Sequence, residues 1–590
     1  MAPTAETRIR EHLAFLYGEQ EAKHLLPQIQ ERLSRFRERN PGLHGKASDP
    51  AEHLTERDSF LITYGDQVTE PGKPPLQTLA EVLKPYVQGV ITGVHLLPFF
   101  PYSSDDGFSV IDYTAVNPEL GTWADIERLG RSFRLMFDAV INHISAGSAW
   151  FRAFVDGNRK YQDYFITVEP GTDLSNVVRP RAKPLLTPVQ TAQGEKLVWT
   201  TFSADQIDLN YANPDTLLDI IDVLLLYVEE GAEVIRLDAI AYIWKKPGTP
   251  SIHLEEAHRL VKLFRAVLDA VAPHVILVTE TNVPHEENVS YFGHGHDEAQ
   301  MVYQFPLPPL VLHTFHTGDA TRLAEWAAGL TSPSDSTTFF NFLASHDGVG
   351  VRPVEGILSP REIEALVDRT REHGGYVSYK TNADGSKSVY ELNISYFDAL
   401  SDPNGDESLD TQVGRFLASQ AIMLSLAGVP GIYVHSLFGS LSHHEGVERT
   451  GQYRSINREK FQRNKLEQAL ADRSSLRHQV FYPYGDLIRA RASHPAFHPH
   501  GAQRVLLPDD MGSASLFALL RTSIVNGRSV FCVHNVSNKQ QQVRANLQAL
   551  DIPGVDGFQD LISGKIYSAK DDALVLTIKP YQVLWLDPLT

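Results

Sequence analysis

Short apolar runs alternate with longer amphipathic stretches between about residues 58 and 490. Each run contains four to eight residues rich in Val, Ile, Leu or Phe, which is typical of a strand buried on both faces. The stretches between them, such as LLDIIDVLLLYVEEGA, have the apolar spacing of helices. Eight such units in one continuous stretch favour an α/β fold, a closed (β/α)8 TIM barrel, over an open sheet. The eight runs are FLITYGDQ, GVHLLPFF, RLMFDAVINH, AEVIRLDAI, HVILVTETN, QMVYQF, TFFNFLASHD and GVPGIYVHSLFG.

The rest of the chain departs from this alternation in three ways. The first residues are charged, with apolar positions at helical spacing, and the last hundred alternate as in strands of a β-sandwich. Two connections, after the third and seventh runs, are too long for ordinary loops and predict inserted subdomains. The predicted units are an N-terminal helical extension (1–57), the barrel (58–143, 206–347 and 401–490), inserted subdomains B (144–205) and B′ (348–400), and a C-terminal β-sandwich (491–590).

Acidic residues follow three of the apolar runs: Asp238, Glu280 and Asp347. A single Asp after a strand can cap the next helix. Several carboxylates at the carboxyl ends of buried strands, however, cost solvation free energy unless a site uses them. In a (β/α)8 barrel these ends converge on one face, where active sites lie. The pattern therefore predicts an enzyme.

Composition narrows the possible partners. The 590 residues carry a formal net charge of -19, which argues against binding nucleic acid or anionic membranes. No apolar run approaches the roughly 18 residues of a membrane span, and the first 20 residues lack the apolar core of a signal peptide. Cys532 is the single cysteine, so no intramolecular disulfide can form, and we expect a cytoplasmic protein.

Two histidine clusters could in principle bind zinc, His294 with His296 and His443 with His444. Neither has the HExxH spacing of a helical zinc site, so solvated loops are the simpler interpretation. The sequence also lacks the glycine-rich fingerprints of nucleotide-binding loops. We therefore expect neither a metal nor an organic cofactor.

Several motifs together resemble one family. DAVINH, VIRLDAIAY, VTETN and LASHDG are similar to the four signature regions of the α-amylase superfamily, glycoside hydrolase family 13. HLLPFFPYSSDDGFSVIDY, VRPRAKPLLTP and YRSINR resemble its sucrose phosphorylase branch, and within that branch the chain most resembles glucosylglycerate phosphorylases. It departs from sucrose phosphorylases at Ser388, where they carry an acidic residue, and at Asn282, where they carry His.

This resemblance implies a retaining mechanism, which needs two carboxyl groups about 5 Å apart. Asp238 matches the nucleophile, and Arg236 beside it is expected to keep that carboxylate ionised and oriented. Glu280 matches the acid/base and should have a raised pKa. Asp347 matches the third carboxylate of the family. The implied substrate-binding residues are Asp105, Phe108, His143, Phe202, Gln206, Arg236, Tyr242, Asn282, His346 and Arg454, and the implied phosphate-binding residues are Arg181 and Tyr390.

The implied activity is reversible phosphorolysis of 2-O-α-glucosylglycerate, with inorganic phosphate as co-substrate. Arg454 or Lys246 could bind the carboxylate of glycerate. Sucrose, sucrose 6′-phosphate or glucosylglycerol remains an alternative donor, an α-glucosidase is an alternative enzyme, and a non-catalytic amylase-like scaffold is a third possibility. The expected partners are a small-molecule α-glucoside and phosphate, with no nucleic acid and no membrane, and a homodimer is possible.

Overall fold

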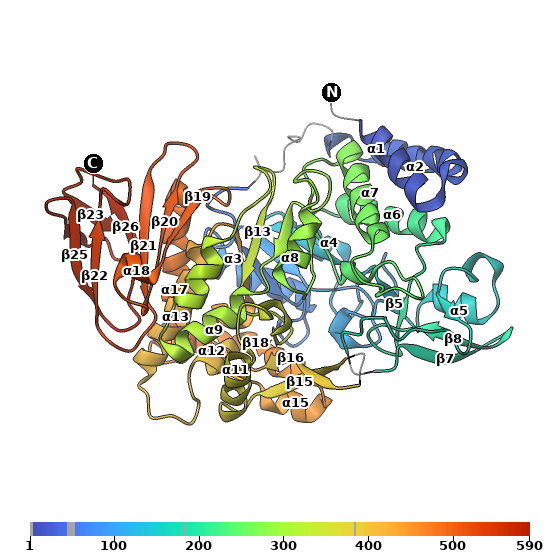
Figure 1. Ribbon diagram of the computed structural model, residues 1–590. Coiled ribbons are helices and arrows are strands. Elements are labelled where there is room, and N and C mark those ends of the chain that lie inside the picture. Colours follow the sequence, from blue (N-terminus) through green and yellow to red (C-terminus); the bar gives the residue numbers. More distant parts are fainter. Residues whose placement is uncertain (1–3, 44–53, 182, 383–384, 590) are drawn as a thin grey trace.

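A closed barrel of eight parallel strands forms the centre of the molecule (Figure 1). The computed structural model describes residues 4–43, 54–181, 183–382 and 385–589. Each predicted apolar run supplies one barrel strand, and the first strand pairs with both the second and the last, so the predicted barrel is confirmed. In order around the barrel the strands are β1 (Phe60–Thr63), β3 (Gly93–Leu96), β4 (Arg134–Ala139), β10 (Ala232–Leu237), β11 (Ile276–Thr279), β12 (Met301–Tyr303), β13 (Thr338–Phe342) and β17 (Val429–Tyr433).

Aromatic side chains fill part of the barrel interior. The rings of Phe60 and Phe340 meet edge to face with centroids 6.2 Å apart. They have room because glycines lie against them: a Cβ on Gly93 would be 2.3 Å from the Phe60 ring, and one on Gly431 would be 2.4 Å from the Phe340 ring. The barrel is therefore a packed core that supports a site at its rim. Helices on its outside include α3 (Pro75–Val87), α4 (Trp123–Gly130), α6 (Pro214–Glu229), α7 (Glu255–Val271), α9 (Leu307–Thr317), α13 (Leu409–Ser425) and α17 (Leu476–Ala492).

Two N-terminal helices, α1 (Ala5–Tyr17) and α2 (Glu19–Arg39), form a hairpin that packs on α7 and α6 (Figure 1, blue). Ile9 and Leu13 on α1 are buried in this contact. An ion pair joins the Nη2 of Arg8 to Asp269 on α7 at 2.8 Å. The hairpin thus adds a layer outside the ring of barrel helices, as the helical spacing of this segment predicts.

Two excursions leave the barrel after β4 and β13. The first contains the antiparallel pair β5–β9 and a three-stranded sheet, and the second contains another three-stranded sheet and a helix. Both three-stranded sheets lie along the lower edge of Figure 1. The limits of subdomains B and B′ remain predictions. The elements are β5 (His143–Ser145), β6 (Thr167–Val168), β7 (Leu186–Thr191), β8 (Gly194–Trp199) and β9 (Gln206–Asp208), then β14 (Val349–Gly350), α11 (Pro360–Glu372), β15 (Tyr376–Thr381) and β16 (Lys387–Asn393).

The C-terminal part consists of two antiparallel sheets around a core of their own, which includes Phe531, Val533, Val543 and Leu574. This is the two-layer arrangement that the alternating pattern predicts. The larger sheet contains β19 (Ala502–Leu506), β20 (Leu516–Thr522), β21 (Ser529–Asn535), β26 (Val583–Pro588), β23 (Gly557–Asp560) and β24 (Ile566–Ser568), and the smaller one β22 (Gln541–Asn546) and β25 (Ala573–Ile578).

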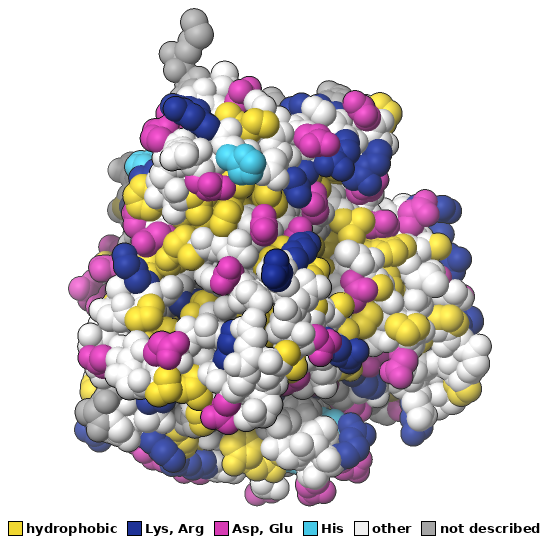
Figure 2. Space-filling view, turned by 90° about the vertical axis from the view of Figure 1, so that its right-hand side faces the viewer, with side chains coloured by type: hydrophobic (Ala, Val, Ile, Leu, Met, Phe, Trp, Pro, Cys, Tyr) yellow, Lys and Arg dark blue, Asp and Glu magenta, His cyan; other side chains and the backbone are white. Residues whose placement is uncertain are grey.

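The surface carries charges of both signs. On the face that includes the N-terminal helices, Lys and Arg side chains are interspersed with Asp and Glu (Figure 2). None of the helices within the described residues is both long and apolar enough to cross a membrane.

Candidate active site

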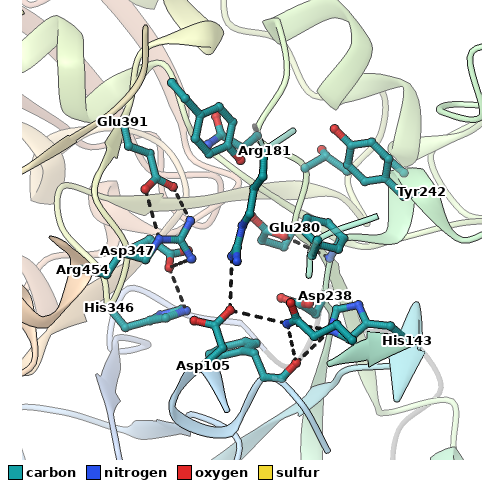
Figure 3. A pocket seen from close by; sticks show the side chains of 18 of the residues that line it. Asp105, His143, Arg181, Asp238, Tyr242, Glu280, His346, Asp347, Glu391 and Arg454 are labelled. Atoms are coloured by element: carbon teal, nitrogen blue, oxygen red, sulfur yellow. Dashed lines mark hydrogen bonds and ion pairs between the residues drawn. The ribbon is translucent and has the colours of Figure 1, made fainter. Parts of the chain in front are cut away.

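A pocket of about 670 Å³ lies at the carboxyl ends of the barrel strands (Figure 3). It brings together side chains from the barrel, from both excursions and from the segment after β17. All predicted site residues line it except Arg236 and the alternative glycerate-binding candidate Lys246. The lining includes Asp105, Phe108, His143, Arg181, Phe202, Gln206, Asp238, Tyr242, Glu280, Asn282, His346, Asp347, Tyr390, Glu391 and Arg454.

Arg236 lies beneath the pocket and not in its wall, with 3% of its side chain exposed. Its Nη1 donates to Asp238 Oδ1 at 2.9 Å and also to Asp138. Asp138 is the register partner of Arg236 on the neighbouring strand β4, and its other carboxylate oxygen lies 2.8 Å from His95 Nε2. In this position Arg236 holds Asp238 from below. Its predicted contact with substrate stays a prediction.

The backbone turns sharply just after Asp238. Ala239 adopts a left-handed conformation, with φ of 48°, which is unfavourable for a residue with a Cβ. This turn lets the Ala239 N–H donate to Glu280 Oε2 at 3.1 Å. Such local strain is often found where a functional side chain must be held in place. Here it connects the two carboxyl groups that end neighbouring strands β10 and β11.

Burial makes these two carboxyl groups unusually basic. It raises the pKa of Glu280 to about 7, with help from the negative charges of Asp238 and Asp347 and against the attraction of Arg236. The raised pKa expected for Glu280 is thus confirmed. Burial also raises the pKa of Asp238, against the attraction of Arg236 and with help from the negative charges of Asp138 and Asp347. Because Arg236 is 2.9 Å from Asp238 and 3.7 Å from Glu280, it favours the ionised form of Asp238 more than that of Glu280.

Asp347 has the opposite character. Burial acts to raise its pKa, but Arg454, His346 and Arg458 outweigh burial and lower the pKa to about 2. Arg454 Nη1 is 2.7 Å from Asp347 Oδ1. His346 stacks on Phe108, with centroids 4.7 Å apart and planes at 5°, and burial lowers its pKa to about 3. Asp347 is therefore a fixed anion beside a neutral imidazole.

Polar groups meet on the opposite wall around the backbone carbonyl of Phe108. His143 Nε2 is 2.8 Å from this carbonyl, and the Gln206 amide donates to it at 2.9 Å. Asp105 accepts from Arg181 Nη2 at 3.2 Å, and Phe202 lies edge-on to Tyr242 with centroids 5.6 Å apart. Carboxylate, amide and imidazole groups around aromatic faces form a suitable site for a hydroxyl-rich ring.

A second, larger cavity of about 1560 Å³ adjoins the pocket and shares Asp105, Arg181, Tyr390, Glu391 and Arg454 with it. Lys183 and Arg458 also line this outer cavity. The inner pocket is therefore rich in carboxylates, and cations collect between it and the outer cavity. This distribution suits a neutral ring inside and an anion outside.

Comparison with known proteins agrees with this geometry. Residues 59–348 match the alpha amylase catalytic domain. The chain is 53% identical to a glucosylglycerate phosphorylase of Allomeiothermus silvanus, over 99% of both chains. It belongs to the α-amylase family. A second family member, a glucosylglycerate phosphorylase of Spirochaeta thermophila, is 49% identical over 98% of both chains. The crystal structure of a sucrose 6F-phosphate phosphorylase from Thermoanaerobacter thermosaccharolyticum aligns with a TM-score of 0.70 and 26% identity, covering 82% of this chain and 94% of that one.

Three charged residues that line the pocket or the outer cavity of this α-amylase family member, Glu391, Lys183 and Arg458, are not among the predicted site residues. Glu391 immediately follows Tyr390 in the quoted motif, but nothing in that motif distinguishes it from a surface residue. Arg458 is the second arginine of YRSINR, so the motif could have pointed to it. Lys246, a candidate for binding glycerate, lies outside both cavities and is 3.8 Å from Glu256.

The histidine clusters do not assemble a metal site in the described part of the chain. His294 Nδ1 instead lies 2.8 Å from Asp297 Oδ2, and the described residues contain no group of three His, Cys, Asp or Glu arranged to hold an ion. The inner pocket contains carboxylates, but their partners are arginines.

Proposed function

We propose that this chain is a retaining glucoside phosphorylase that converts 2-O-α-glucosylglycerate and phosphate into α-glucose 1-phosphate and glycerate. The observation that carries the proposal is one pocket in which a raised-pKa acid, a second carboxylate and an outer group of cations meet. The two glucosylglycerate phosphorylases described above support this choice of substrate, since the chain aligns with them over nearly its whole length.

The first step forms a covalent intermediate. Asp238, held by Arg236, attacks the anomeric carbon of the glucosyl group. Glu280 transfers its proton to the glycosidic oxygen, so glycerate leaves with a hydroxyl group at its second carbon. A pKa of about 7 keeps a large fraction of Glu280 protonated near neutral pH. Asp347 stabilises the positive charge that develops on the ring.

The second step reverses these roles. Phosphate enters the place that glycerate has left, and Glu280, now ionised, accepts a proton from it. A phosphate oxygen displaces Asp238 from the anomeric carbon, and the double inversion gives the α-configuration of glucose 1-phosphate. Arg181 and Tyr390 line both cavities and are suited to bind phosphate, since a guanidinium presents several donors to an oxyanion.

Three other functions make different predictions. A sucrose, sucrose 6′-phosphate or glucosylglycerol phosphorylase would run the same chemistry on another donor. An α-glucosidase would release free glucose at a rate that does not depend on phosphate. A non-catalytic scaffold would not need the three carboxylates that this pocket contains.

One assay separates all four possibilities. The protein is incubated with phosphate and, separately, with glucosylglycerate, sucrose, sucrose 6′-phosphate and glucosylglycerol, and both glucose 1-phosphate and free glucose are measured. We expect phosphate-dependent formation of glucose 1-phosphate, fastest from glucosylglycerate. Faster turnover of another donor would overturn the substrate, and phosphate-independent release of glucose would overturn the reaction.

A further inference from the structure

The acceptor side of the pocket contains a buried carboxylate that the mechanism above does not use. Glu391 lies on β16, and only 2% of it is exposed. It accepts from Arg454 Nε at 3.1 Å and also from Arg454 Nη2. A negative charge here repels both phosphate and the carboxylate of glycerate. Its position therefore requires a role other than direct attraction of the acceptor.

Arg454 connects Glu391 to the sugar side of the pocket. While Nε and Nη2 bind Glu391, Nη1 lies 2.7 Å from Asp347 Oδ1, so the guanidinium lies between two carboxylates (Figure 3). Glu391 belongs to the excursion after β13, and Asp347 follows β13 itself. A guanidinium fixed at both ends has few donors left for a third anion.

A second arginine of the outer cavity is held in the same way. Arg458 Nη1 lies 2.5 Å from Asp106 Oδ2, and its Nε donates to the backbone carbonyl of His346 at 2.8 Å. It also lies 3.6 Å from Asp347. The donors of Arg454 and Arg458 are thus directed mainly at carboxylates of the protein itself, and few remain for the anion of an acceptor.

Two other cations of the outer cavity have fewer carboxylate partners than Arg454 and Arg458. Arg181 has one carboxylate partner, Asp105, at 3.2 Å. Lys183 lines the outer cavity, and no ion pair links it to another residue of the described ranges. Burial and the positive charge of Arg181 lower the pKa of Lys183, which fits two cations lying close together. An anion placed between them would relieve that repulsion.

We propose that Glu391 is a positioning residue that holds Arg454 on Asp347, and that Arg181 and Lys183 bind the anionic group of the acceptor. The identity of this group, the carboxylate of glycerate or phosphate in its place, rests on the proposed function. In this proposal Glu391 acts on the sugar side of the pocket, through Arg454 and Asp347, whereas Lys183 acts on the side that binds the anion.

The role of Glu391 is tested with E391Q and E391D. The rate of glucosyl transfer from α-glucosyl fluoride to water is measured without phosphate, and the KM for phosphate is measured with the same donor. In E391Q, Arg454 loses its ionic partner and one negative charge disappears, so kcat should fall about tenfold while the KM for phosphate also falls. E391D keeps the charge but is one methylene shorter, so kcat should fall without a lower KM.

Two results would overturn this role. A higher KM for phosphate in E391Q would make Glu391 a direct ligand of the acceptor. An unchanged kcat in both variants would show that Arg454 does not need Glu391 to hold it against Asp347. Glutamine has nearly the shape of glutamate, so thermal melting of E391Q is compared with wild type to separate misfolding from loss of positioning.

Lys183 is tested by exchanging a charged acceptor for an uncharged one. Glucosyl transfer from glucose 1-phosphate to glycerate and to glycerol is compared, because these acceptors differ by one carboxylate. In K183Q the ratio of kcat/KM for glycerate to that for glycerol should fall about tenfold. K387Q is the matched control, since Lys387 is exposed and lines neither cavity. An unchanged ratio in K183Q would refute the assignment.

A third measurement keeps this test independent of the natural acceptor. If the wild-type protein does not use glycerate, the proposed substrate is wrong, but the KM for phosphate with α-glucosyl fluoride still tests Lys183. We expect this KM to rise about tenfold in K183Q. No rise would overturn the proposed anion site whatever the natural acceptor is.

Discussion

Asp238 and Glu280 are chemically similar residues that their surroundings push towards different roles. Arg236 donates to Asp238 at 2.9 Å, whereas Glu280 has only a 3.7 Å approach from Arg236 and one backbone donor, Ala239. Arg236 therefore stabilises the ionised form of Asp238 more than that of Glu280. These contacts support the proposed roles of Asp238 as nucleophile and Glu280 as acid.

Replacement of Asp238 by Asn should abolish turnover. The amide cannot form the covalent intermediate, so release of glucose 1-phosphate should fall by on the order of 10³-fold or more. Asp335→Asn is the control, because Asp335 is exposed and does not line the pocket. Substantial glucosyl transfer by the Asp238 variant would refute its assignment as the nucleophile.

The pKa of Glu280 predicts a pH dependence. Its folded-state value of about 7 means that the proton needed by the leaving oxygen is present below pH 7 and is lost as the pH rises through it. The kcat/KM for glucosylglycerate should therefore decline above about pH 7. With α-glucosyl fluoride, whose leaving group needs no proton, this alkaline decline should disappear, and Glu280→Gln should retain far more activity on the fluoride. Equal declines with both donors would exclude Glu280 as the acid.

Among the elements, the barrel strands could be predicted and β16 could not. The eight strands are buried on both faces, so their sequences are mainly apolar and stand out without knowledge of the fold. Burial of Glu391 on β16 depends on a partner far away in sequence: its register partner is Gly350 on β14. A Cβ on Gly348 would lie 3.1 Å from that of Glu391, so glycines permit the close approach. Neither contact is visible from the local pattern KSVYELN.

The α1–α2 hairpin allows a prediction about stability separate from catalysis. Leu13 is fully buried against the barrel helices, so Leu13→Asp places a carboxylate in an apolar contact. We expect the free energy of unfolding to fall by about 3 kcal/mol or more. The kcat of the folded fraction should stay near wild type, because the hairpin lies outside the ring of helices. Urea unfolding followed by circular dichroism measures the first effect, with Glu11→Gln, exposed on the same helix, as the control. An unchanged midpoint would contradict the packing.

At the scale of the whole molecule, buried arginines join the C-terminal sheets to the barrel. Arg521 on β20 is fully buried and donates to the backbone carbonyls of Ser425, at the end of α13, and of His498, at 2.9 and 2.7 Å. Burial lowers its pKa to about 10, which leaves it charged at neutral pH. Trp585 on β26 packs against Phe497 at a centroid distance of 4.8 Å in the same region. These contacts join the larger C-terminal sheet to the main hydrophobic core, so the sheet and the barrel should unfold together.

We therefore expect one cooperative unfolding transition for the wild-type protein, with tryptophan fluorescence and circular dichroism changing at the same denaturant concentration. Arg521→Met fills much of the same volume but leaves the carbonyls of Ser425 and His498 without their donor, so the free energy of unfolding should fall by about 3 kcal/mol. Arg504→Met is the matched control: Arg504 lies on β19 of the same sheet, is exposed and pairs with Asp551 at the surface, so its loss should cost less than about 1 kcal/mol. Equal effects of the two substitutions would mean that the sheets are joined to the barrel by apolar packing alone. If Arg521 is the link, its variant should also separate the two optical transitions, because the sheets then lose their hydrogen-bonded connection to α13.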